Sequence, residues 1–177
     1  MAQITPIFHF TAVAIYVVAL ICAAVSDFRS MEIPNWTSIA IAVTFLPSAW
    51  FAGISAFDIS VHYGIGAVLL AGGAVLFAKG VIGGGDVKLL AAAGVWMDLD
   101  DIGPYLVVVS LLGGLLAIGI LAVNRVAALR RMLAALPWAG GKQGVSQPIP
   151  YGVAIALAAL YLLPKLSASA SCCYPFN

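Results

Sequence analysis

Long apolar segments separated by short polar connections make up almost the whole chain. A transmembrane helix needs roughly 20 apolar residues, so most of these segments can be read as spans or near-spans. The fourth segment is too short to cross a membrane alone, and we expect it either to be buried among its neighbours or to end below the far surface of the membrane. The pattern predicts an all-α polytopic membrane protein of about six transmembrane helices, the fourth short and following a glycine turn. The segments cover about residues 7–25, 36–51, 61–78, 87–97, 105–123 and 153–163.

Polar and helix-breaking residues predict where these helices begin and end. The first is expected to stop at a polar elbow, residues 26–35, because Pro34 cannot continue a helix. Asn35 can then cap the second helix, and Asp86 stands where the cap of the short fourth helix belongs. Gly103 and Pro104 are expected to open the fifth.

The amino-acid composition excludes a soluble protein. Hydrophobic residues make up 63% of the chain and charged residues 8%, whereas about a quarter of the residues of a soluble domain are charged. We therefore expect one membrane-embedded domain over residues 1–177. Residues 125–142 should form a cytoplasmic loop with an interfacial helix, and residues 167–177 a disordered tail. Nothing in the charge pattern indicates a nucleic-acid partner; the lipid bilayer is the expected one.

The distribution of charge predicts the orientation in the membrane. Basic residues gather in alternate connections, and the positive-inside rule assigns these to the cytoplasm. With six spans, both termini would lie on the outer side, and the protein would be a multi-pass protein of a bacterial inner membrane. Asp27 and Asp86 would then both lie on the cytoplasmic side. The basic residues in question are Arg29, Lys79, Lys88, Arg125, Arg130, Arg131 and Lys142.

Two carboxylates are the candidate chemistry. The chain has only seven acidic residues, and an ionisable residue at membrane depth is a functional candidate by default. If Asp27 and Asp86 approach each other they share a proton, so one can act as general base on a water while the other protonates a scissile carbonyl. Glu32 is better explained by a solvated ion pair with Arg29. This chemistry needs no metal or cofactor, and the three cysteines lack metal-ligand spacing.

Three elements of the sequence carry a resemblance to a known family. The run from Gly83 to Lys88, Gly-Gly-Gly-Asp-Val-Lys, contains the Gly-x-Gly-Asp signature of membrane aspartyl proteases followed by the x-Lys of type IV prepilin peptidases. Asp27 with the Ile-Pro-Asn elbow at residues 33–35 resembles the first catalytic motif of that family. Pro-Tyr-Gly at residues 150–152 is similar to the element that opens its last span. The resemblance covers roughly residues 10–163.

The resemblance implies an aspartyl endopeptidase that removes the cytoplasmic leader of prepilins after a glycine, with Asp27 and Asp86 as its dyad. The chain lacks the paired Cys-x-x-Cys zinc motifs of the bifunctional members. It looks like the short branch that serves Flp, or tight-adherence, pili, with pilus-assembly machinery as a further partner. Candidate substrate-binding or loop residues are Gly83, Gly84, Gly85, Lys88, Pro34 and Asn35.

Two other functional classes remain open at this point. In a small proton- or ion-coupled transporter, Asp86 would be the coupling carboxylate and the glycine run a break in a discontinuous helix. No inverted repeat or second glycine-interrupted span supports that interpretation. In a purely structural membrane subunit, Asp86 would only cap a helix.

Overall fold

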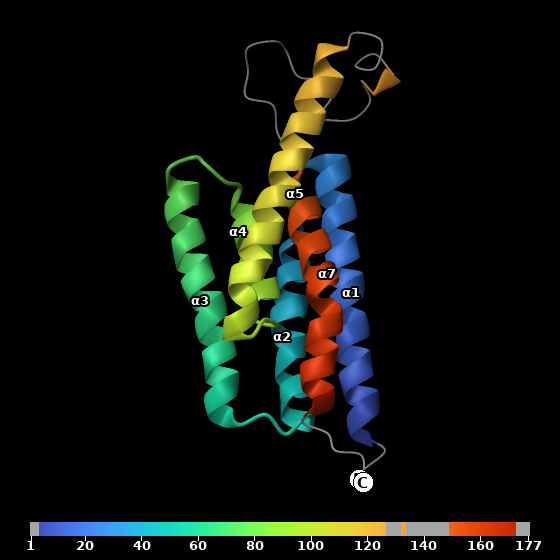
Figure 1. Ribbon diagram of the computed structural model, residues 1–177, viewed down its shortest axis with the longest axis vertical. Coiled ribbons are helices and arrows are strands. Elements are labelled where there is room, and N and C mark those ends of the chain that lie inside the picture. Colours follow the sequence, from blue (N-terminus) through green and yellow to red (C-terminus); the bar gives the residue numbers. More distant parts are fainter. Residues whose placement is uncertain (1–3, 127–131, 134–148, 173–177) are drawn as a thin grey trace.

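The computed structural model is a bundle of helices (Figure 1). It describes residues 4–126, 132–133 and 149–172, and within these ranges it contains six helices and no strand. The predicted all-α class is therefore confirmed for the described chain. The helices are α1 (Ile4–Ser30), α2 (Asn35–Phe51), α3 (Ala56–Ala78), α4 (Gly84–Gly94), α5 (Leu99–Arg125) and α7 (Tyr151–Cys172).

Three of the helices are long and apolar enough to cross a membrane. They contain the segments His9–Ser30, Ala56–Ala78 and Leu99–Val123, and α7 contributes a shorter apolar segment, Tyr151–Leu163. This makes the chain a membrane protein, but it does not confirm the predicted number of six spans. α2 has 17 residues and α4 has 11, so both fall short of the usual length of a span.

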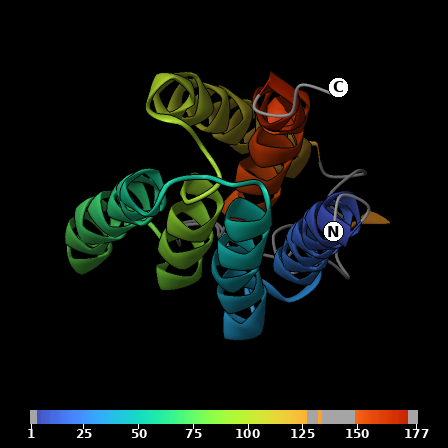
Figure 2. The ribbon, with the colours of Figure 1, turned by 90° about the horizontal axis from the view of Figure 1, so that it is seen from below.

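The short helix α4 lies inside the bundle, which is one of the two places that its length predicts (Figure 2). It packs against α2, α3 and α7, and residues 91–97, at its end and just beyond it, are all buried. Two indole contacts of Trp96 fix this region: the ring lies 4.6 Å from that of Tyr16, and its Nε1 donates to the Ile41 carbonyl at 2.8 Å. α4 is thus a core element whose C-terminal end is fixed in the bundle.

α3 lies at the edge of the bundle and is held mainly by α4. A Cβ added at Gly73 would come 2.6 Å from Val87 Cγ1, and one added at Gly66 would come 2.6 Å from Val95 Cγ2. The missing side chains therefore permit the close approach of the two helices.

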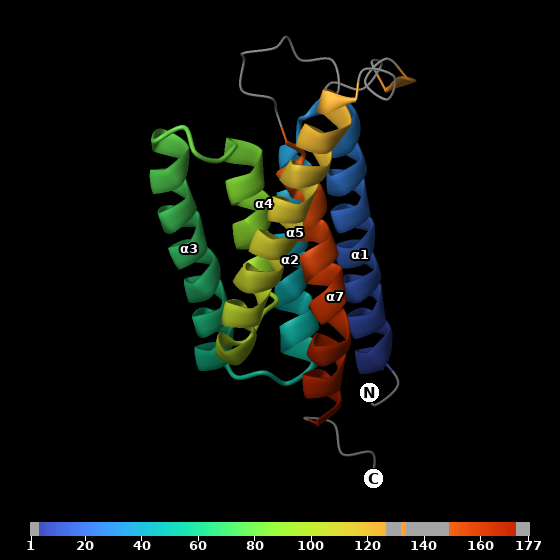
Figure 3. The same ribbon diagram turned by 45° about the horizontal axis from the view of Figure 1, so that its top comes forward.

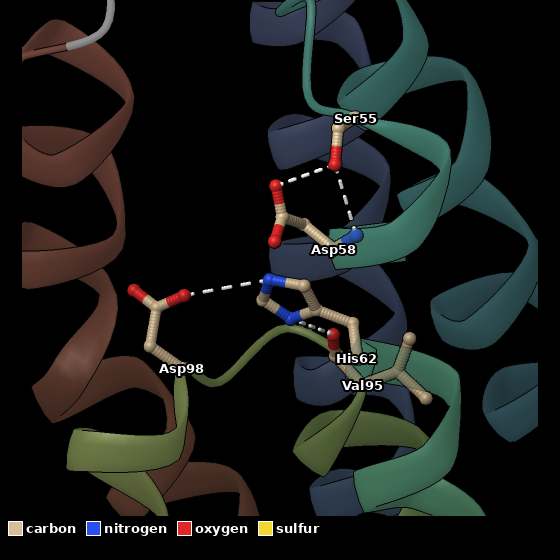
Figure 4. Close-up of polar contacts among 5 residues, drawn as sticks. All are labelled: Ser55, Asp58, His62, Val95 and Asp98. Carbon is tan, nitrogen blue, oxygen red and sulfur yellow. Dashed lines mark hydrogen bonds and ion pairs between the residues drawn. The ribbon is translucent and has the colours of Figure 1, made fainter. Parts of the chain in front are cut away.

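Polar contacts also tie the first half of α3 to the segment that follows α4 (Figure 4). Ser55 caps α3 by accepting from the Asp58 backbone N–H at 3.1 Å. One turn further along, the ring of His62 lies 3.0 Å from the Val95 carbonyl through Nδ1 and 3.4 Å from Asp98 through Nε2. These contacts lie at the opposite end of α4 from its glycine-rich start, so they brace the helix from the far side.

Several predicted helix boundaries are wrong, each because a polar residue is accommodated inside a helix. α1 continues to Ser30 instead of stopping near Val25, since the Ser30 hydroxyl donates to the Ser26 carbonyl at 2.7 Å. α5 begins at Leu99, and Pro104 lies inside it near its start. Asp98 is the N-cap residue, and Asp100 and Asp101 fall in the first turn, where the helix dipole favours acidic groups.

The predicted features of the last third of the chain fall partly outside the described residues. Most of the loop at 125–142, with its expected interfacial helix, lies there. α7 extends to Cys172, so residues 167–172 of the expected disordered tail are helical.

Candidate active site

Three helix ends that are far apart in sequence meet at one end of the bundle. The last turn of α1, the first turn of α4 and the first turn of α7 all lie near the top in Figures 1 and 3. Asp27 belongs to the first of these ends and Asp86 to the second. Helix N-termini carry unpaired N–H groups and a partial positive charge, so two of the three ends favour carboxylates nearby.

Asp27 is held by the N-terminus of α7. Its side chain is buried, with 5% of the residue exposed, and Oδ2 accepts a hydrogen bond from the Gly152 backbone N–H at 2.7 Å. A Cβ added at Gly152 would lie 2.8 Å from that same oxygen and 2.7 Å from Ile33 Cδ1. Glycine is therefore the residue that lets the α7 backbone reach the carboxylate.

A strained elbow follows Asp27. Met31 has a φ of 57°, the left-handed conformation that non-glycine residues seldom adopt, and its N–H donates to the Asp27 carbonyl at 2.9 Å. The Ser26 hydroxyl donates to the Glu32 carbonyl at 2.7 Å, which ties the elbow back to the helix. Pro34 then takes the N-cap position of α2, and its carbonyl accepts from the Thr37 hydroxyl at 2.7 Å. Pro34 thus shapes the elbow.

Asp86 lies in the first turn of α4, and its predicted position as the N-cap is wrong. Gly83 is the N-cap residue, and its backbone N–H donates to the Asp86 carboxylate from three residues away. This is the return contact of a capping box, here with an aspartate at the third helical position. Gly83 has a φ of −72°, and the positive-φ glycines of the described chain are Gly53 and Gly80.

The glycine run serves close packing, because a side chain at any of its three positions would meet a neighbour. An added Cβ would lie 2.8 Å from Asp86 Oδ2 at Gly83, 3.3 Å from the Phe77 ring at Gly84 and 3.1 Å from Ile33 Cβ at Gly85. The contact between Gly85 and Ile33 brings the start of α4 against the elbow that follows Asp27.

Asp27 and Asp86 line one cavity of about 340 Å³, which we call the carboxylate cavity. The charge pattern predicts that the two residues lie on one side of the membrane, and the structure brings them to one cavity. Glu32 lines it as well, and no ion pair joins Glu32 to Arg29 within the described residues, contrary to expectation. The lining residues are Asp27, Met31, Glu32, Ile33, Asn35, Gly83, Gly84, Gly85, Asp86 and Lys88.

Burial in this cavity changes the acidity of Asp86, which lies in α4, outside the three spanning helices. The pKa of Asp86 is raised from 3.8 to about 7, chiefly by burial and also by the negative charge of Asp27, whereas the hydrogen bond from the Gly83 N–H lowers it. The side chain of Asp86 therefore keeps its proton up to near-neutral pH. A carboxyl group that is protonated near neutral pH, beside a second carboxyl group, can donate a proton that the other can accept.

Lys88 and Asn35 form a second polar pair at the edge of the cavity. Lys88 Nζ donates to Asn35 Oδ1 at 2.9 Å, across 53 residues of sequence. Asn35 is the first residue of α2 and does not cap it, because its side chain turns to Lys88. The pair links the first turns of α2 and α4.

Sequence reasoning did not identify Gly152 as a residue of the site. The available signal was the Pro-Tyr-Gly element itself, since a glycine just inside a helix start costs stability unless a close contact requires it. The contact here is the Asp27 carboxylate.

Together, a bundle of apolar helices and two carboxylates in one cavity define a membrane-embedded protein with an aspartate-pair site. No group of three or more His, Cys, Asp or Glu residues in the described chain could hold a metal ion. The model of the type IV leader peptidase family matches residues 14–120, well over half of the chain and including both aspartates. The chain belongs to this family and is a protease of the leader peptidase type. No curated protein and no solved structure matches the chain.

Proposed function

We propose that the protein is an endopeptidase that removes the leader of prepilins after a glycine, with Asp27 and Asp86 as its catalytic pair. The observation that carries this proposal is the carboxylate cavity, in which two aspartates from different helices share one polar space. Glu32 lines the same cavity but is exposed and belongs to the elbow. Pairing of the two aspartates gives a chemistry that needs no nucleophilic side chain, metal or cofactor.

The geometry supports a division of roles within the pair. Asp27 accepts a backbone N–H through Oδ2, so as a carboxylate it can take a proton from a bound water with its other oxygen. Asp86, protonated near neutral pH, donates to the scissile carbonyl oxygen. Attack of the water gives a tetrahedral diol. The diol collapses as the C–N bond breaks, the amine takes the proton held by Asp27, and Asp86 regains its own.

The cavity is proposed to face the cytoplasm of a bacterial inner membrane, with both termini on the periplasmic side. The support is the positive-inside pattern together with the fold. α1 begins and α7 ends at the end of the bundle opposite the cavity (Figure 3). Arg29, Lys79 and Lys88 lie near the end that holds Asp27 and Asp86, where cytoplasmic basic residues are expected. The resemblance to the short branch makes Flp-type pilins the proposed substrates.

Processing of a prepilin in intact cells tests the reaction and the orientation together. Co-expression with an Flp-type prepilin should give a mature pilin whose new N-terminus follows the leader glycine, as read by mass spectrometry. The leader remains in the cytoplasm, so processing requires a cytoplasmic site. An uncleaved prepilin beside a well-expressed, membrane-inserted enzyme would contradict the proposal.

The pKa of Asp86 predicts how cleavage by the purified enzyme depends on pH. Because the pKa of Asp86 is raised to about 7, the protonated form that acts as the acid predominates below that pH and is lost above it. We expect kcat/KM to fall about tenfold per pH unit above about 7. The Asp100→Asn variant, altered at an exposed carboxylate far from the cavity, should give the same profile. A rate that rises through pH 7 to 9 would exclude Asp86 as the acid.

A further inference from the structure

An apolar groove of about 430 Å³ lies between α2, α3 and α4, beside the carboxylate cavity. α2, α3 and α4, the last with its C-cap residue Val95, each contribute four residues spaced i, i+3, i+4 and i+7, so each presents a single face over two turns, or about 10 Å. α4 forms the floor because it packs against both α2 and α3. The lining residues are Asn35, Ser38, Ile39, Ala42, Tyr63, Gly66, Ala67, Leu70, Lys88, Ala91, Ala92 and Val95.

The two ends of the groove differ in chemistry. One end is closed by the Tyr63 hydroxyl, which donates to the Ala42 carbonyl at 2.9 Å and so joins α3 to α2. The other end is bounded by the hydrogen bond between Lys88 and Asn35. Between the ends the walls are small or apolar, except for the buried hydroxyl of Ser38, which has no hydrogen-bond partner among the described residues.

Asn35 and Lys88 line the groove and the carboxylate cavity alike. A chain that lies in the cavity can therefore continue into the groove by passing this pair. The polar space around Asp27 and Asp86 and the apolar space between α2 and α3 thus form two adjoining parts of one surface.

We propose that the groove binds the apolar segment of the substrate that follows the scissile bond. This inference rests on the proposed function and adds where the substrate lies. A prepilin cut after glycine has a basic leader on one side of the bond and a hydrophobic segment on the other. The carboxylate cavity is polar and can hold the scissile peptide bond. The groove has mainly apolar walls and can hold the hydrophobic segment. Its length of about 10 Å accommodates about two turns of a helical segment.

A bulky side chain in the groove should weaken binding of substrates that carry the apolar segment. Ala67 is an exposed lining residue of α3, so Ala67→Phe adds volume without entering the core. With a synthetic prepilin that includes about 12 apolar residues, we expect KM to rise about tenfold or more. For a peptide that ends two residues beyond the scissile bond, the kcat/KM of Ala67→Phe should equal that of the wild-type enzyme. Ala14→Phe, at an exposed site of α1, is the matched control and should affect neither substrate.

The two substrates separate this inference from the proposed function. If the wild-type enzyme cleaves both and Ala67→Phe also cleaves both normally, the groove proposal is wrong and the peptidase stands. An equal loss on both substrates also overturns it, since the defect would then lie outside the groove. If the wild-type enzyme cleaves neither substrate, the proposed function itself fails.

Photo-crosslinking tests the occupant without relying on turnover. Ile39 is 60% exposed at the groove, so replacing it with p-benzoylphenylalanine disturbs little packing. In the Asp86→Asn background with the synthetic prepilin, adducts should map to the apolar residues after the scissile bond. The same replacement at Ala14 should give no adduct with the prepilin. Adducts to lipid alone would make the groove a lipid site, and adducts to the leader would reverse the proposed direction of the chain; either result overturns the inference.

Discussion

Asp27→Asn and Asp86→Asn should each lower the rate of prepilin cleavage by about 10²–10⁴-fold, the range that general acid or base groups contribute. Asparagine keeps the size of the side chain but can neither donate nor take up the proton that the reaction moves. In Asp27→Asn the amide oxygen can still accept from the Gly152 N–H, so the contact between α1 and α7 is retained. Initial rates measured with purified protein and a synthetic prepilin report the effect.

Asp100→Asn is the control for this prediction, because Asp100 is exposed in the first turn of α5, far from the cavity. It should cleave at the wild-type rate. If either Asp27→Asn or Asp86→Asn cleaves at a rate close to that of the wild type, the aspartate-pair mechanism is wrong. If both are inactive and no longer inserted in the membrane, Asp→Glu replacements at the same positions, which keep the carboxyl group, separate folding from chemistry.

The proximity of Asp27 and Asp86 was predictable because it depends on topology. Alternating basic connections assign both residues to one side of the membrane, and in so small a bundle few elements can meet on one side. The central position of α4 is one of the two places predicted for an apolar segment that is too short to span a membrane. These features follow from length and charge, which are properties of the sequence itself.

The exact helix boundaries and the role of Gly152 were not predictable, because they depend on tertiary contacts. The polar residues after Val25 suggest a loop, yet Ser30 satisfies its hydroxyl within the helix and α1 continues. Asparagine is a residue type that often caps helices, but the side chain of Asn35 accepts a hydrogen bond from Lys88, which is 53 residues away. The glycine run is compatible both with a turn of positive φ and with close packing, and only the tertiary contacts decide between them: side chains at Gly84 and Gly85 would meet Phe77 and Ile33.

Gly152→Ala should lower the rate of cleavage by about 10²-fold, although neither aspartate is substituted. The added methyl group would come 2.8 Å from Asp27 Oδ2 and 2.7 Å from Ile33 Cδ1, so the carboxylate, the elbow or the start of α7 must move. A misplacement of about 1 Å in a catalytic group can cost about 10²-fold in rate. The peptide N–H that donates to Asp27 remains, so the variant tests the close approach and not the loss of a donor. The measurement is kcat/KM with the synthetic prepilin.

Gly64→Ala is the matched control for Gly152→Ala, because both glycines are helical but an added Cβ at Gly64 meets nothing within 4 Å. Alanine in a helix is favoured over glycine by about 0.5–1 kcal/mol, so Gly64→Ala should be fully active and at least as stable as the wild type. Gly152→Ala gains the same propensity, and a midpoint of thermal unfolding near that of the wild type would show that the bundle persists. A loss of activity under that condition places the defect where Gly152 meets Asp27 and Ile33. Wild-type activity in Gly152→Ala would mean that the carboxylate need not be held at the position in which α7 fixes it.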